Sequence, residues 1–125
     1  MAVVNYTVQA LAPGASNRDC VLVSWALANG DSGTPFDGAA YADRSVQVRG
    51  TFGAGGNARI EGSLLPSAAP ADADYATLTD PQGNALDITA EKIEAVSELT
   101  RLIRPRITAG DGTTALVVYL IARRK

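Results

Sequence analysis

Apolar and polar side chains alternate along much of this chain with a period of two residues. This period places the apolar side chains of a segment on one face and the polar ones on the other, as in half-buried β-strands. We therefore predict four strands in the first half of the chain. Their apolar faces consist of Val4, Tyr6 and Val8; Val21, Val23, Trp25 and Leu27; Val46, Val48 and Phe52; and Ile60 and Leu64.

A glycine-rich segment, residues 53–57, joins the third and fourth of these strands. Glycine and asparagine tolerate the positive φ angles of a tight reversal, which favours a hairpin. If Phe52 lies opposite Ala58, Arg49 falls opposite Glu61 on the polar face. A cross-strand pair of opposite charge contributes about 0.2–1 kcal/mol. The local pattern thus predicts that the two strands pair directly with each other.

Shorter elements are predicted further along the chain. After an exposed loop rich in proline, alanine and aspartate, residues 65–74, two short strands flank a turn at residues 80–83. Thr89 is placed to cap one or two turns of helix, with Ile93 and Val96 facing inward. This segment would be the one short helix of the domain.

The last two predicted strands, residues 102–108 and 115–121, form a second hairpin around glycine-rich residues 110–112. Pro105 has no amide hydrogen to give to a ladder, which places the first of these strands at an edge or a bulge. In total the pattern gives about eight strands, a count typical of an all-β antiparallel sandwich or jelly roll. The 125 residues, 46% of them hydrophobic, suit a single domain, residues 1–125.

The final strand is apolar on both faces. Leu116, Val118 and Leu120 fill one face, while Val117, Tyr119 and Ile121 fill the other. One interpretation is a central strand whose second face is covered by the helix or by a long loop. The other is that the second face meets another subunit.

Four further side chains are interface candidates. Phe36 and Tyr41 belong to a long irregular loop, residues 29–43, and such loops are often functional. The two rings either fold back onto the core or anchor a neighbouring protein. Arg104 and Arg106, with the basic C-terminus, are either solvated edge-strand charges or a contact for an acidic partner.

The composition argues against catalysis and metal binding. The sequence has no histidine and one cysteine, which removes the commonest general base, an intramolecular disulfide and a Cys-rich zinc site. The run at residues 50–56 lacks the Gly-Lys-Ser/Thr ending of a phosphate loop, and Ser24 lacks the context of a nucleophile elbow. Two aspartate pairs lack the spacing of an EF-hand. These pairs are Asp31 with Asp37 and Asp72 with Asp74.

Charge and hydropathy limit the partners. A net charge of −2 without long runs of either sign gives no reason to expect nucleic acid or an anionic membrane. The N-terminal residues lack the pattern of a signal peptide, and the apolar run at residues 115–122 is far shorter than the roughly 20 residues that span a bilayer. We expect a soluble protein with no catalytic residue, cofactor or metal ion.

Three segments of the chain resemble small proteins from the head-gene clusters of tailed phages: residues 45–56, 80–86 and 103–113. Some proteins of that type are cement, or decoration, proteins with a jelly-roll fold on the capsid exterior. The resemblance implies a structural virion protein, made in the host cytoplasm and bound to the outside of the head. Its implied partners are the major capsid protein and further copies of itself, as a dimer or trimer.

Two other functions remain as alternatives. A carbohydrate-binding or host-attachment module would suit a sandwich, but sugar sites usually display aromatic platforms, and the chain has one Trp, four Tyr and two Phe. An enzyme is the least favoured, because activated nucleophiles and histidine-based acid–base pairs are missing from the sequence.

Overall fold

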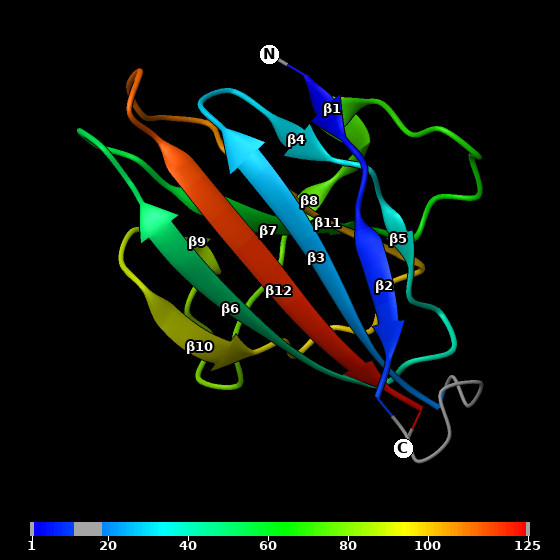
Figure 1. The fold of residues 1–125 in the computed structure, drawn as a ribbon. Helices are drawn as coiled ribbons and strands as arrows, with labels where there is room; N and C mark the ends of the chain where they lie inside the picture. The colour runs from blue at the N-terminus through cyan, green and yellow to red at the C-terminus, as the bar shows by residue number, and fades with distance from the viewer. Residues whose placement is uncertain (1, 12–18, 125) are drawn as a thin grey trace.

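The computed structural model describes residues 2–11 and 19–124, which form an all-β structure of two sheets with almost no helix (Figure 1). A single turn of 3-10 helix, η1 (Asp72–Asp74), interrupts the strands. The strands are β1 (Val3–Val4), β2 (Thr7–Ala10), β3 (Cys20–Ala28), β4 (Ser32–Gly33), β5 (Phe36–Asp37), β6 (Asp43–Thr51), β7 (Ala58–Ser63), β8 (Ala76–Thr77), β9 (Asp87–Ile88), β10 (Lys92–Ala95), β11 (Leu102–Arg106) and β12 (Ala115–Arg123).

The front layer in Figure 1 is a five-stranded antiparallel sheet in the order β10-β6-β12-β3-β2. Its three central strands, β6, β12 and β3, are each nine residues long and pair over their whole lengths. Tyr119, in the middle of β12, lies between Ser24 of β3 and Gln47 of β6. These ladders place β12 at the centre of the sheet, paired with a neighbouring strand along both of its edges.

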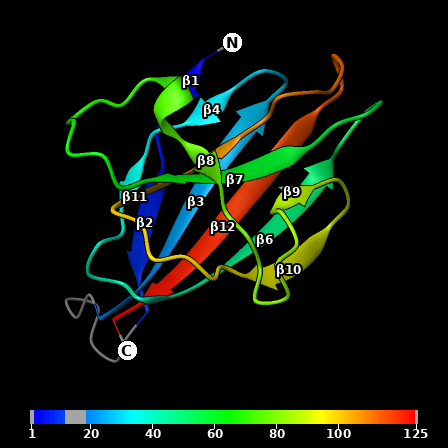
Figure 2. The same ribbon diagram turned by 180° about the vertical axis from the view of Figure 1, so that it is seen from behind.

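The rear layer, seen from behind in Figure 2, is a seven-stranded sheet in the order β1-β4-β11-β7-β8, with β5 also on β11 and β9 also on β7. β11 lies inside this sheet rather than at its edge. The β4–β5 segment has three residues, 33–35, where the facing part of β11 has only two, Arg104 and Pro105. Pro105 therefore lies at a bulge, which is one of the two positions predicted for it. The flanking pairs are Ile103 with Phe36 and Arg106 with Ser32.

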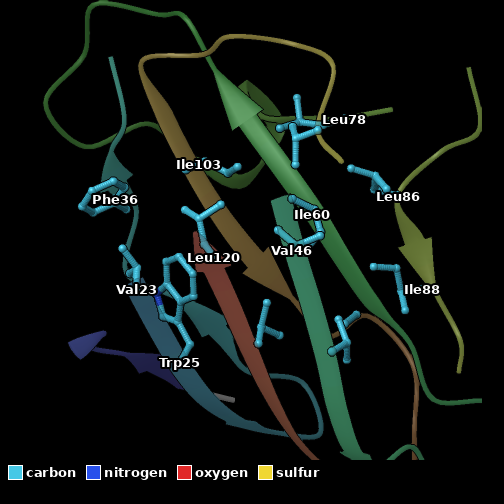
Figure 3. Close-up of a cluster of buried hydrophobic side chains, with 14 of the residues drawn as sticks. Val23, Trp25, Phe36, Val46, Ile60, Leu78, Leu86, Ile88, Ile103 and Leu120 are labelled. Carbon is cyan, nitrogen blue, oxygen red and sulfur yellow. The ribbon is translucent and has the colours of Figure 1, made fainter. Parts of the chain in front are cut away.

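The hydrophobic core fills the space between the two layers (Figure 3). The predicted apolar face of β3 is confirmed, since Val21, Val23, Trp25 and Leu27 are all buried. The rear sheet contributes Ile60, Ile88 and Ile103. The predicted first strand is divided between the layers, because β1 joins the rear sheet and β2 the front sheet.

Both predicted hairpins are wrong in the same way. β6 and β7 belong to different sheets, and so do β11 and β12. The turn at residues 53–57 is present, with positive φ at Gly53 and Gly55, but it carries the chain from one layer to the other. The turn does not determine which sheet the next strand joins, because β6 pairs instead with β12, over nine residues. Arg49 consequently pairs with Glu91, at 3.6 Å, and not with Glu61.

The predicted helix after Thr89 is also wrong. Residues 92–95 form the edge strand β10, which pairs with β6. Ile93 therefore points outward and is 65% exposed, although Val96 is buried as expected. The fourth predicted strand is wrong in the same way at Leu64, which lies beyond the end of β7 and is exposed. Glu61 and Ser63 of that strand are buried instead of exposed, because the sequence does not reveal what covers the second face of a strand.

The turn at residues 80–83 is confirmed. The amide of Gly83 donates to the carbonyl of Asp80 at 2.9 Å, and Thr79 bridges to Ala85. The Asp80 carboxylate accepts the amide hydrogens of Gln82 and Asn84, an Asx-type arrangement that turn aspartates favour. The short strands on either side of this turn are β8 and β9, and both pair with β7.

Candidate functional site

The outer face of the five-stranded sheet is open (Figure 1). Val117 and Tyr119 are half-buried on this face, and Ile121 is 41% exposed. No described element covers them, so the interpretation in which the helix or a long loop of the same chain roofs β12 is wrong. We call this surface the sheet patch. It consists of Leu22, Ile93, Val117, Tyr119 and Ile121, brought together from β3, β10 and β12.

The strand register arranges the sheet patch in rows. One row crosses all five strands as Thr7, Ser24, Tyr119, Gln47 and Ile93. The next row is Gln9, Leu22, Ile121, Ser45 and Ala95. Neither row contains a carboxylate, guanidinium or ammonium group, so the middle of the face is uncharged. A hollow of about 230 Å³ lies between Ile93, Tyr119 and Ile121.

Ion pairs flank the sheet patch at its two ends. Arg123 donates to the Asp43 carboxylate at one end. At the other end Arg49 lies 3.6 Å from Glu91, whose pKa is lowered, first by the hydrogen bond from the amide of Gly50 and then by Arg49. Each pair is closed within the chain, so the ends of the face are polar without a net charge.

The rear sheet has a different outer face, which carries a buried ion-pair cluster. Arg104 donates to Glu61 at 3.0 Å and to Asp72 at 2.9 Å, and its guanidinium lies 3.8 Å from the centre of the Tyr75 ring. Arg106 lies 3.6 Å from Glu61 and 3.7 Å from Asp72. Asp72 belongs to the loop that follows β7, so the cluster fastens that loop across the sheet.

Arg104 is buried inside a sheet rather than solvated at an edge, so the edge-strand interpretation is wrong for it. The Arg104 hydrogen bond is the main cause of the lowered pKa of Asp72. Burial raises the pKa of the neighbouring Tyr75. Arg106 is partly exposed and contacts the same carboxylates, so the pair does not form a free basic patch.

A second exposed apolar region lies beside this cluster, at the β8 edge of the rear sheet. Leu64, Leu65 and Leu99 are exposed there, with Leu64 at 70%. They line a groove of about 740 Å³ together with Thr77 and Thr100. We call this surface the leucine groove. The guanidinium of Arg101 donates to the carbonyls of Leu65 and Ser67 and so fixes the segment that begins at Leu65.

Phe36 and Tyr41 are both buried, as expected if the two rings fold back onto the core. Their ring centroids are 5.8 Å apart, and Phe36 also meets the edge of Tyr6 at 5.6 Å. Trp25 is buried in the same cluster. These rings are therefore unavailable as surface anchors or as a stacking platform for a sugar.

The groups considered for chemistry are engaged in local hydrogen bonds. Ser24 Oγ lies 2.7 Å from Thr7 Oγ1, and Asp74 accepts the amide hydrogen of Ala71. Asp31 accepts from the amides of Ala2 and Ala28. Within residues 2–11 and 19–124, no three His, Cys, Asp or Glu side chains are grouped to hold a metal ion. The same part of the chain contains no helix with the length and hydropathy to cross a bilayer.

Asp111 joins the two turns that cross between the sheets. Its carboxylate accepts from the hydroxyl and amide of Thr113 and from the amide of Ala54, and these hydrogen bonds lower its pKa to about 2. A carboxylate with a lowered folded-state pKa stabilises the fold above its unfolded pKa and loses that contribution as it is protonated. The Asp111 contribution should therefore be complete above about pH 4 and vanish as the pH falls to about 2.

We predict that Asp111→Asn lowers the melting temperature at neutral pH, and that its difference from the wild type shrinks between about pH 4 and pH 2. Thermal unfolding followed by circular dichroism over this range measures the difference. Asp37→Asn is the matched control, because Asp37 is an exposed carboxylate at the end of β5 that accepts a hydrogen bond from the amide of Ala39. A difference for Asp111→Asn that stays constant with pH would contradict the assignment.

Sequence reasoning missed several of these surface residues. The capping pattern predicts Ile93 on the inner side of a helix, although Ile93 and Ala95 alternate with Lys92 and Glu94 as a strand requires. The alternation from Ile60 predicts Leu64 in the core. Leu65 and Leu99 carry no periodic signal, because they lie in irregular segments on either side of β8.

Comparison with known proteins adds no family. No protein-family model matches the chain, and no curated protein matches it.

Proposed function

We propose that this chain is a jelly-roll structural protein that serves as a cement protein on the exterior of a tailed-phage head. The observation that carries the proposal is the presence of two exposed apolar surfaces, the sheet patch and the leucine groove, on different layers of the fold. Large exposed apolar patches mark protein–protein contacts. A protein that bridges its neighbours needs at least two such contacts, facing in different directions.

The order of strand pairs supports the jelly-roll assignment. In a jelly roll the first strand pairs with the last, the second with the second-last, and so on inward, so that one long hairpin is rolled into two sheets. Six antiparallel pairings of this chain follow that order, at four nested levels. They are β3 with β12, β4 and β5 with β11, β6 with β10, and β7 with β8 and β9. Jelly rolls are common in viral capsid proteins, which agrees with the proposed role.

The mechanism we propose is mechanical. Packaged DNA presses outward on the shell, and a cement protein ties neighbouring capsomers so that their separation must break additional interfaces. We assign the capsid contact to the leucine groove. Each contact is modest, but many copies that each hold more than one capsomer add up to a large collective stabilisation. Loops and a strand edge on a rigid scaffold suit such contacts, and the groove has both.

We predict that the purified protein co-sediments with expanded, undecorated capsids of its own phage and raises their disruption temperature. It should bind free major capsid protein much more weakly, because the site forms where capsomers meet. The variant Leu64→Lys/Leu99→Lys should bind capsids at least about tenfold more weakly, since burial of one leucine contributes roughly 1.5–3 kcal/mol. Val3→Lys, at an equally exposed apolar residue of the same sheet, is the control.

Two results would refute this proposal. The first is a wild-type protein that fails to sediment with capsids of its own phage. The second is a set of capsids whose disruption temperature is the same with and without the bound protein.

A further inference from the structure

The sheet patch has an aromatic side chain at its geometric centre. Tyr119 is the middle residue of the nine-residue strand β12, and β12 is the middle of five strands. Residues that dominate binding energy cluster near the centre of an interface and are enriched in tyrosine. In this sheet the centre is half-buried Tyr119, with Ile121 and Leu22 in the adjacent row. The polar ion pairs lie toward the ends, as a rim would.

We propose that the sheet patch binds a second copy of this chain, so that two five-stranded sheets pack face to face about a two-fold axis near Tyr119. This inference concerns the chain in solution and does not depend on the proposed capsid role. Of the two oligomers that the resemblance implies, a dimer and a trimer, the inference selects the dimer. Three features of the face support a second copy as the occupant: its area, its charge and its relief.

The area is sufficient for a small dimer interface. The three central strands of nine residues extend about 30 Å each and the two edge strands of four residues about 13 Å each, with about 4.8 Å between strands. The face therefore offers about 550 Å² per copy, or about 1,100 Å² in total, just above the roughly 1,000 Å² that a biological interface requires. A contact with only part of this face would leave much of its apolar surface in water.

The charge pattern suits a partner identical to the chain itself. Around a two-fold axis each central residue meets its own copy or a close neighbour, so a charge at the centre would face a like charge. The two rows through Tyr119 and Ile121 contain no such charge. The charges that flank them are already paired within the chain, as Arg123 with Asp43 and Arg49 with Glu91. The face therefore presents no unpaired charge to recognise an oppositely charged partner.

The relief of the face is self-complementary. Ile93 protrudes from the edge strand, and beside it lies the hollow of about 230 Å³ lined by Ser45, Tyr119 and Ile121. Packed sheets interdigitate their side chains. Bulky side chains of one copy would fill the hollow of the other, and a symmetric contact forms this match twice.

Sedimentation equilibrium of the purified protein, without capsids, tests the inference. We expect a dimer at low micromolar concentration. Ile121→Lys should weaken the dimer at least about tenfold, because it buries an unpaired charge near the axis. Ile93→Lys is a second variant at the exposed edge strand, where folding is least at risk, and it should weaken the dimer in the same direction. Val3→Lys, on the other sheet, should dimerise like the wild type.

Cross-linking tests the geometry. With Cys20→Ser as background, Ser24→Cys places the chain's one thiol beside Tyr119, and a short bis-maleimide should give covalent dimers in high yield. Thr77→Cys, at the edge of the rear sheet, should give few. A monomer at tens of micromolar, an oligomer other than a dimer, or a dimer unaffected by both lysine variants would overturn the inference. Because no capsid is present, any of these results leaves the capsid proposal to be judged separately.

Discussion

Replacement of Arg104 by methionine should lower the free energy of unfolding by about 3–5 kcal/mol, because it removes the buried hydrogen-bond donor of the Glu61 carboxylate and leaves that carboxylate only the partly exposed Arg106, at 3.6 Å. Glu61 is 4% exposed and receives the Arg104 Nε–H at 3.0 Å. The substitution also releases Asp72, and with it the loop fastened across the rear sheet. Urea unfolding followed by far-UV circular dichroism gives the free energy.

Two further variants isolate the cause of this loss. Arg106→Met removes a partly exposed guanidinium that lies 3.6 Å from the same Glu61 carboxylate, and it should cost no more than about 1 kcal/mol. The double variant Arg104→Met/Glu61→Met removes both buried charges and should recover most of the stability lost by Arg104→Met. If the double variant were no more stable than the single one, the loss would come from packing or from the released loop, and not from an unpaired charge.

Local patterns predicted the parts of the fold that local forces determine. The apolar face of β3 and the turn at residues 80–83 were correct, since alternation and turn chemistry depend on neighbouring residues. Sheet membership is different, because it depends on strands far apart in the sequence. β12 pairs with β3 and β6 over nine residues each, and no local pair such as Arg49 with Glu61 competes with ladders of that length. The two expected hairpins failed for this reason.

The candidate surfaces also differ in whether neighbouring residues or distant segments determine them. The double apolar character of residues 115–121 correctly marked β12 as a central strand with a second apolar face. The burial of Arg104 could not be predicted, because it results from a loop that folds back over β11 and brings Asp72 within 2.9 Å. The leucine groove could not be predicted either, since β8, β9 and β10 lie between Leu64 and Leu99 in the chain, and only the folded structure brings the two residues together.

The two proposals support one another if both hold. A dimer formed through the front sheets would carry its rear sheets, and hence its two leucine grooves, on its outer sides. Such a pair would reach two capsomers at once, and the second contact would form at the high effective concentration set by the first. Ile121→Lys should then weaken capsid binding indirectly, through loss of the dimer, whereas Leu64→Lys/Leu99→Lys should weaken it directly. In sedimentation without capsids, only Ile121→Lys of these two variants should reduce the amount of dimer.

Trp25→Ala should destabilise the fold about as much as Arg104→Met, by about 3–5 kcal/mol, through loss of the largest side chain in the core. Trp25 is buried between the layers, and its ring meets the edge of Tyr6 at 5.9 Å. Its Nε1–H donates to the carbonyl of Thr34 at 2.9 Å. Rear-sheet residue Gly33 lies so close that a Cβ there would be 2.6 Å from that nitrogen, so the alanine variant would leave a cavity lined by both sheets.

Trp25→Phe separates the ring from the hydrogen bond. Phenylalanine fills most of the same space but leaves the Thr34 carbonyl without a donor, which should cost about 1–3 kcal/mol. Because Trp25 is the one tryptophan of the chain, unfolding has to be followed by circular dichroism, not by intrinsic fluorescence. Equal losses for the two variants would mean that the hydrogen bond, and not the volume of the indole, accounts for the stability that Trp25 contributes between the two sheets.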